Sequence, residues 1–253
     1  MARSNTYFSF KQFTIHQGQC AMKVGTDGVL LGSWANVTGA QRILDVGTGT
    51  GLIALMLAQR TENTEQQMAQ KPVQIHAIEI DRAAAQQAQE NVANSTWHNR
   101  IQVYCFPLQT YVERCQITYD LIIANPPFFE NAYKASNMAR TVARHTDTLT
   151  LDNLLHAASQ LLVAQGRICV IYPVEMAQEF LIQSQILGFS CLRMLRVKPT
   201  AQLPVKRILL DLMKNEEGCH QWHCQEETLV LEKHRHIYTP EFTRLVKDFY
   251  LKL

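Results

Sequence analysis

Short apolar runs rich in β-branched residues alternate with stretches of helical periodicity from residue 42 onward. This alternation is typical of βαβ units, in which parallel strands form a central sheet and helices cover its two faces. The pattern therefore predicts an α/β fold with a doubly wound, Rossmann-like and mostly parallel sheet. The expected strands are 42–46, 73–79, 100–105, 119–124 and 167–172, and the expected helices are 52–60, 83–93, 151–162 and 174–187.

Two further expected strands, 191–197 and 207–213, are joined by a proline-containing loop. The loop is too short to hold a crossover helix, so these two strands should pair antiparallel. We therefore expect the mostly parallel sheet to carry an antiparallel last strand.

The first forty residues precede the sheet and follow a different pattern. Three phenylalanines between residues 8 and 13 indicate an extended aromatic segment, and Thr26 or Asp27 can cap a short helix after it. We expect one main domain, residues 41–253, with residues 1–40 as an N-terminal extension packed on it.

Length and composition are those of an ordinary globular enzyme, with 253 residues, 47% of them hydrophobic and 18% charged. The longest apolar runs are far shorter than the ~18 residues that a membrane span needs, and the N-terminus lacks the apolar core of a secretory signal. Seven scattered cysteines fit thiols in a reducing compartment. These features predict a cytoplasmic protein without a membrane partner. They leave its oligomeric state open, with a monomer favoured.

Basic residues gather in three segments that contain no acidic residue: 1–26, 131–146 and 186–210. They hold eleven Lys and Arg residues, and because the whole chain carries a formal charge of +2, the rest carries −9. A basic face on an acidic body suits a polyanion, although three solvated loops pointing in different directions would give the same pattern. The expected RNA contacts are Arg3, Lys11, Arg140, Arg144, Arg193, Arg196, Lys198, Lys206 and Arg207.

A glycine-rich turn, Asp-Val-Gly-Thr-Gly-Thr-Gly at 45–51, follows the first expected strand and precedes a helix. This is the ligand-binding corner of an open α/β sheet. The third glycine comes one residue earlier than in the G-x-G-x-x-G pattern that binds dinucleotides. Asp45 offers an acceptor for a cationic group, and Glu79, at the end of the second strand, is placed to bind ribose hydroxyls. A cation and a ribose together fit S-adenosylmethionine.

The sequence Asn125-Pro126-Pro127-Phe128 stands at the end of the fourth expected strand. Each proline keeps the preceding residue extended and lacks an N–H group, so carbonyl acceptors remain free. The side-chain oxygen of Asn125 and the carbonyl of Pro126 can accept the two hydrogens of an exocyclic amine and aim its lone pair at a methyl group. Phe128 would stack on the base. These four residues are the predicted catalytic residues.

Together these motifs resemble class I S-adenosylmethionine-dependent methyltransferases, and the tetrapeptide resembles the members that modify planar nitrogens. Phe10-Lys-Gln-Phe13, the segment 22–32 and Ala143-Arg144-His145 further resemble the bacterial tRNA1(Val) (adenine-37 N6) methyltransferase family, over nearly the whole chain. The resemblance implies methyl transfer from S-adenosylmethionine to N6 of an adenine in tRNA, expected at position 37 beside the anticodon of a valine tRNA. In that family the region Lys23–Asp27 helps to close the cofactor site.

The class usually has an acidic residue after the third strand to meet the cofactor adenine, whereas this chain has Cys105-Phe106-Pro107. Phe106 is therefore the expected contact. The cofactor-binding residues are then expected to be Lys23, Thr26, Asp27, Asp45, Gly47, Thr48, Gly49, Gly51, Glu79, Ile80, Phe106 and Asn125.

Other functions share parts of this pattern. A guanine-N2 rRNA methyltransferase can carry the same Asn-Pro-Pro-Phe, a protein-glutamine methyltransferase would bring a larger helical N-terminal domain, and a non-catalytic RNA-binding module has no use for Asn125. The cluster Cys219-His220-Gln-Trp-His223-Cys224 lacks the paired spacings of structural zinc sites. We therefore expect a polar turn there and no metal, and His145 is expected to be a phosphate contact or plain surface.

Overall fold

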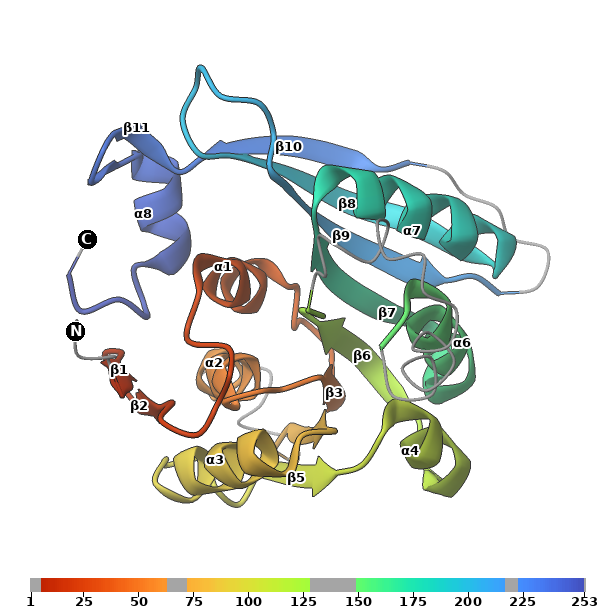
Figure 1. Ribbon diagram of the computed structural model, residues 1–253. Coiled ribbons are helices and arrows are strands. Elements are labelled where there is room, and N and C mark those ends of the chain that lie inside the picture. Colours follow the sequence, from red (N-terminus) through yellow and green to blue (C-terminus); the bar gives the residue numbers. More distant parts are fainter. Residues whose placement is uncertain (1–5, 63–71, 128–148, 217–222, 253) are drawn as a thin grey trace, which may run out of the picture.

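The computed structural model describes residues 6–62, 72–127, 149–216 and 223–252. A twisted central sheet is covered by helices on both faces (Figure 1). In chain order the elements are β1 (Tyr7–Ser9), β2 (Thr14–His16), α1 (Thr26–Trp34), β3 (Arg42–Val46), α2 (Leu52–Arg60), β4 (Gln74–Glu79), α3 (Arg82–Ala93), β5 (Ile101–Cys105), α4 (Leu108–Arg114), β6 (Tyr119–Ala124), α6 (Leu151–Leu161), β7 (Leu162–Tyr172), α7 (Val174–Ile186), β8 (Phe189–Lys198), β9 (Arg207–Lys214), β10 (Gln225–Val230), β11 (Glu232–His234), β12 (Ile237–Tyr238) and α8 (Pro240–Val246).

The main sheet of the described residues has the strand order β10-β8-β9-β7-β6-β3-β4-β5. β3 pairs in parallel with β4 on one side and β6 on the other, so the direction in which the chain crosses the sheet reverses at β3. β3 and α2 have the bounds that the sequence predicts. The doubly wound α/β fold is thus confirmed, and its switch point lies at the carboxyl ends of β3 and β6.

Each face of the sheet buries its own hydrophobic cluster. α1, α2 and α8 cover one cluster, which includes Leu30, Ile43 and Leu209, and α4, α6 and α7 cover the other, which includes Leu44 and Phe180 (Figure 1). Neighbouring residues of one strand, such as Ile43 and Leu44, therefore point to opposite clusters, as the pleat requires. Both faces of the central strands are apolar because helices cover both.

The antiparallel strand is confirmed as β9, which lies between β7 and β8 and pairs antiparallel with both. It is not the last strand of the sheet, however, because β10 follows it and pairs in parallel with β8 at the edge. β10 has no alternating apolar pattern to reveal it: residues 225–228 are exposed and only Leu229 is buried. An edge strand with polar side chains on both faces leaves little hydrophobic signal.

The described part of the N-terminal extension joins the main core. Phe10 and Phe13 stack with ring centroids 4.8 Å apart, and Phe10 pairs with Tyr250 near the other end of the chain. Helix α1 follows as expected, but the prediction that Thr26 or Asp27 caps it is wrong. The N-cap is Gly25, which makes no side-chain cap bond, and the carboxylate of Asp27 accepts from a distant arginine instead.

None of the helices in the described ranges combines the length and the apolar character needed to cross a membrane.

Candidate functional site

The predicted cofactor and catalytic residues meet at the switch point of the sheet. Val46 and Ala124 are partners at the carboxyl ends of β3 and β6. Gly47 and Asn125 directly follow these partners, so the glycine-rich loop and the catalytic loop leave the sheet side by side. This crevice outside the strand ends is where open α/β sheets bind ligands.

The glycine-rich loop needs its glycines because three of them adopt left-handed backbone. Gly47, Gly49 and Gly51 have φ of 71°, 57° and 80°, a region in which a side chain is strained. The backbone N–H groups of Gly47 and Thr48 both donate to the carbonyl of Ile78, at 2.9 and 3.0 Å. A Cβ added at Gly49 would meet nothing within 4 Å, which leaves room for a ligand to approach the backbone.

Asp45 is fully buried at the base of this loop. Its Oδ2 accepts from the Thr48 hydroxyl at 2.6 Å and from the Ala54 N–H at 3.2 Å, whereas its buried Oδ1 has no partner. Burial raises the pKa of Asp45 to about 7, against the opposing effect of those two hydrogen bonds. A buried carboxylate short of a partner favours a cationic group beside it, which fits the ammonium of S-adenosylmethionine.

Glu79 ties the end of β4 to the glycine-rich loop. Its Oε2 accepts from the Gly49 N–H at 2.9 Å, and its Oε1 accepts from the N–H groups of Ile80 and Asp81 at 2.8 and 3.0 Å. An ionised carboxylate offers about four acceptor positions, so one remains for a ribose hydroxyl. The Glu79 carboxylate is thus held at the end of β4, which is the position that the sequence predicts for it.

Two other predicted cofactor contacts flank Glu79. Glu79 and Cys105 are register partners at the ends of β4 and β5, so Ile80 and Phe106 leave neighbouring strand ends. Ile80 is 45% exposed. Phe106 is half-buried, with the Arg114 guanidinium 5.1 Å from its ring centroid. Both can offer an apolar surface to a purine ring, although the residues directly after β5, Phe106 and Pro107, include no acid to meet its amine.

Lys23 holds its own loop together. Its Nζ donates to the carbonyls of Gln17 and Cys20, the latter at 3.0 Å. Burial raises the pKa of the Cys20 thiol, and the charges of Glu79 and Asp81 add to this effect. The loop therefore lies near the Glu79 end of the site.

Asn91 is a site residue that sequence reasoning missed. It lies buried on α3, where its Nδ2 donates to the carbonyls of Thr50 and His16 at 2.8 Å and its Oδ1 accepts from the His16 N–H at 2.9 Å. It thereby links the glycine-rich loop to β2. A signal was present, since Asn91 lies among the alanines and Val92 on the buried face of an expected helix, and a polar group there needs partners.

The first turn of α1 lies against the catalytic loop. A Cβ built on Gly28 would be 3.7 Å from Nδ2 of Asn125, in ordinary van der Waals contact, and 3.1 Å from Cδ2 of Leu52, which is the tighter approach. Asp27, one residue earlier, forms an ion pair with Arg207 of β9, with 2.7 Å between Oδ2 and Nε. Thr26 is exposed beside it. The beginning of α1 therefore lies next to Asn125, and the ion pair between Asp27 and Arg207 of β9 holds it there.

Within the catalytic tetrapeptide, Asn125 is half-buried, Pro126 is buried and Pro127 is exposed. Phe128 lies outside the described residues, as do Arg140, Arg144 and His145. The described part places the amide of Asn125 at the same corner as Asp45 and Glu79, and its alignment with a substrate amine remains a prediction.

The expected RNA contacts separate into groups. Lys198, Lys206 and Arg207 flank the β8–β9 loop, and because β8 runs in the same direction as β3, this loop leaves the sheet at the edge that holds the catalytic corner. Lys11 donates to the Lys247 carbonyl at 2.6 Å on another side of the fold, and Arg196 pairs with Glu226. Arg3 lies outside the described residues.

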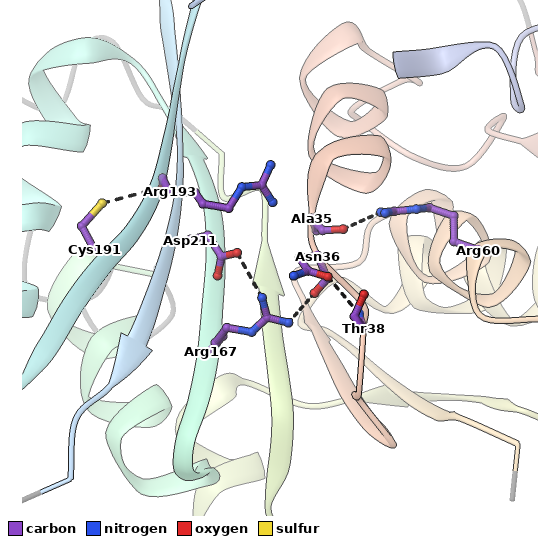
Figure 2. A network of polar contacts seen from close by, with 8 residues as sticks. All are labelled: Ala35, Asn36, Thr38, Arg60, Arg167, Cys191, Arg193 and Asp211. Carbon is purple, nitrogen blue, oxygen red and sulfur yellow. Dashed lines mark hydrogen bonds and ion pairs between the residues drawn. The ribbon is translucent and has the colours of Figure 1, made fainter. Parts of the chain in front are cut away.

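Arg193 differs from the other basic residues because it packs inside the fold. Its guanidinium lies 4.3 Å from the ring centroid of Trp34, and Figure 2 shows it turned toward the segment that follows α1, beside the ion pair of Arg167 and Asp211. This placement gives Arg193 a packing role, and an RNA contact by it remains a prediction.

The residues that the structure describes contain no group of three His, Cys, Asp or Glu side chains that could hold a metal ion. Cys219 and His220 of the cysteine–histidine cluster lie outside those residues.

The chain is similar in sequence to known proteins. Residues 22–192 match the methyltransferase small domain family. The chain is 53% identical over 245 residues to the tRNA1(Val) (adenine(37)-N6)-methyltransferase of Trichodesmium erythraeum, covering 97% of this chain and 98% of that protein. It is 45% identical over 250 residues to a protein of the same name from Parabacteroides distasonis, covering 99% and 100% of the two chains.

The fold is also similar to solved structures. A predicted O-methyltransferase from Agrobacterium tumefaciens aligns with a TM-score of 0.64 at 20% identity, over 88% of this chain and 96% of that one. A chain described as a class I S-adenosylmethionine-dependent methyltransferase from Listeria monocytogenes aligns with a TM-score of 0.57 at 10% identity, over 87% and 66%. At such identities the likeness shows the fold alone. The match over residues 22–192 and the full-length similarity to relatives show that the chain belongs to the tRNA1(Val) (adenine(37)-N6)-methyltransferase family, within the methyltransferase small domain family.

Proposed function

We propose that this protein uses S-adenosylmethionine to methylate N6 of an adenine in tRNA, at position 37 beside the anticodon of tRNA1(Val). The observation that carries the proposal is the position of Asn125 and Pro126 at the switch point, beside the loop that Asp45 and Glu79 hold. The names of the relatives, which cover nearly the whole chain, supply the substrate.

The cofactor would be held by the chain's own charges and loop backbone. Asp45, whose Oδ1 has no partner, would meet the ammonium group, and Glu79 would accept from a ribose hydroxyl. Ile80 and Phe106 offer apolar surface at the neighbouring strand ends. Bound S-adenosylmethionine would supply an electrophilic methyl group.

Asn125 and Pro126 would orient the adenine amine. An exocyclic amine is a poor nucleophile because its lone pair is delocalised into the ring, and two acceptors for its hydrogens let the nitrogen pyramidalise. Pro126 has no N–H to compete for them, and its ring fixes the loop. Phe128 would stack on the base. No general base is required, because the methylated amine becomes acidic and loses its proton afterwards.

The tRNA would be held by basic residues around this corner. An adenine in an anticodon loop is already unpaired, so little energy is spent on extruding it. Lys198, Lys206 and Arg207 flank a loop at the same edge of the sheet, and phosphate contacts by the two lysines would position the RNA while Asn125 selects the amine.

The proposal is tested with an unmodified tRNA1(Val) transcript and labelled S-adenosylmethionine. Digestion of the product should yield labelled N6-methyladenosine, and a transcript with guanine in place of adenine 37 should take up no label. Label in the substituted transcript, or in a nucleoside other than N6-methyladenosine, would contradict the proposed substrate.

A further inference from the structure

A hollow of about 320 Å³ lies beside the first turn of α1, and no residue of the glycine-rich loop lines it. Its walls come from three parts of the chain: the start of α1, the ends of β8 and β9, and the residue after β10. The residues that matter for its chemistry are Thr26, Asp27, Leu30, Pro199, Lys206 and Arg207. This volume is at the lower end of the range for small-molecule sites, enough for one ring system.

The hollow is next to the catalytic corner. Asp27 lines it, and the next residue, Gly28, approaches Nδ2 of Asn125. Lys206 and Arg207 reach it from the β8–β9 loop at the same edge of the sheet. A nucleic acid that presents one base to Asn125 would therefore pass this end of the sheet, where a neighbouring nucleotide could reach the hollow.

The lining combines apolar walls with a polar pair. Leu30 and Pro199 give it an apolar surface on which a flat ring can pack. The Asp27–Arg207 pair, with side chains 27% and 31% exposed, places a carboxylate and a guanidinium in the lining, and Nη1 of Arg207 also donates to the Lys206 carbonyl at 3.0 Å. Base edges carry such donors and acceptors, so the lining suits an unstacked nucleobase.

The charge of the pair also favours a base over a phosphate. Asp27 neutralises Arg207 across 2.7 Å, and a carboxylate at that distance would repel a phosphate group. Lys206 is exposed at the rim, where an ammonium suits the backbone of the same nucleotide.

We propose that this hollow binds the base of a nucleotide adjacent to the methylated adenosine. The inference rests on the proposed function and extends it, because the enzyme would then bind a second unpaired base besides the methylated adenine. Single-stranded loops are recognised through bases that leave the stack and pack on side chains. In this arrangement Asn125 selects the amine and the hollow selects the loop in which the adenine lies.

The test uses tRNA1(Val) transcripts in which the base on one or the other side of adenine 37 is replaced by an abasic ribose. With the wild-type enzyme, loss of one neighbouring base should reduce kcat/KM roughly tenfold, as expected for a lost stacked base. Loss of the base on the other side should have a smaller effect.

Variants then assign that base to the hollow. Lys206→Trp places an indole at the rim and should reduce kcat/KM about tenfold more on the intact transcript than on the sensitive abasic transcript. Both transcripts lose the Lys206 phosphate contact, and only the intact one has a base to exclude. Gln202→Trp lies on the same loop but does not line the hollow, and it should change neither rate.

Three outcomes would overturn the inference. Equal rates of the wild-type enzyme on all three transcripts would show that the enzyme binds no second base. Equal losses in Lys206→Trp on intact and abasic transcripts would indicate a phosphate contact instead. Absence of N6-methyladenosine from the intact transcript would remove the proposed function and this inference with it, whereas the first two results leave the proposed function in place.

Discussion

The two sides of the site are held together in different ways. On the cofactor side, Asp45 and Glu79 accept from backbone N–H groups, at Ala54 and Gly49, that lie within 35 residues of them. On the substrate side, Asp27 and Arg207 are 180 positions apart in sequence and join through charged, partly exposed side chains. The first is a local motif built on the sheet, and the second is a long-range contact that needs the whole fold.

Arginines from other elements contact both ends of α1. Arg207 binds Asp27 at its beginning, and Arg60 donates to the carbonyl of Ala35 at its end, at 2.6 Å. Figure 2 shows Arg167 reaching from β7 to the carbonyl of Asn36, at 2.7 Å, while it pairs with Asp211. The helix next to Asn125 is thus positioned by cations, and its arrangement should respond to charge changes that leave the buried cofactor corner unaffected.

The largest effect should come from Asn125→Ala. We expect turnover to fall roughly 100-fold or more, because a positioned acceptor for the transition state is lost. Affinity for S-adenosylmethionine, measured by calorimetry, should stay near that of the wild type. Asn94→Ala, at an exposed asparagine after α3, is the control. Full turnover of Asn125→Ala with saturating tRNA would rule out the proposed role.

The cofactor side should respond to its two carboxylates. Asp45→Asn and Glu79→Gln keep the side-chain shapes but remove charge-assisted bonds worth ~1.5–3 kcal/mol each. Calorimetry should therefore show at least tenfold weaker binding of S-adenosylmethionine in each variant. Thermal unfolding serves as the control for folding. Wild-type affinity for S-adenosylmethionine in both variants would show that Asp45 and Glu79 do not bind the cofactor.

The substrate side should respond to Arg207→Asp, which places two carboxylates against each other. We expect tRNA affinity to fall about fivefold to tenfold, because two carboxylates then face the RNA where an ion pair stood, while cofactor affinity stays unchanged. The double change Asp27→Arg with Arg207→Asp restores an ion pair and should recover thermal stability. Equal losses of cofactor and tRNA affinity in Arg207→Asp would show that the two sides are not separable.

The smallest effect concerns pH. Burial raises the pKa of Asp45 from 3.8 to about 7, so its anionic, cation-binding form increases as the pH rises through about 7. Affinity for S-adenosylmethionine should rise a few-fold between about pH 6 and pH 8 and then level off. For folding the sign is reversed: the stability that this group contributes is full below about pH 4 and is lost as the pH rises through about 7. Asp45→Asn should flatten both dependences, and a pH profile unchanged by this variant would exclude Asp45 as their origin.

The sequence predicts the cofactor side better than the substrate side, for a physical reason. β3 and α2 fall where expected because a buried parallel strand and the helix after it carry strong apolar patterns over consecutive residues. The partner of Asp27 could not be found in this way, since a polar residue of a helix carries no signal of an arginine 180 residues later. Its carboxylate was expected to cap α1 and instead binds Arg207.

The same limit applies to β10 and Asn91. β10 pairs with β8 through its backbone, and its exposed Gln and Glu side chains give no strand pattern. Asn91 acts through hydrogen bonds to Thr50 and His16, which depend on how α3 packs. Contacts between distant segments are set by the fold and not by local pattern.

Methylation of an adenine amine in tRNA by this corner can be checked against every competing substrate at once. The protein is incubated with labelled S-adenosylmethionine and the total unmodified RNA and protein of a bacterium, and the labelled residue is identified by mass spectrometry. We expect N6-methyladenosine at position 37 of tRNA1(Val). Label in N2-methylguanosine of ribosomal RNA, or in methylglutamine of a release factor, would contradict it.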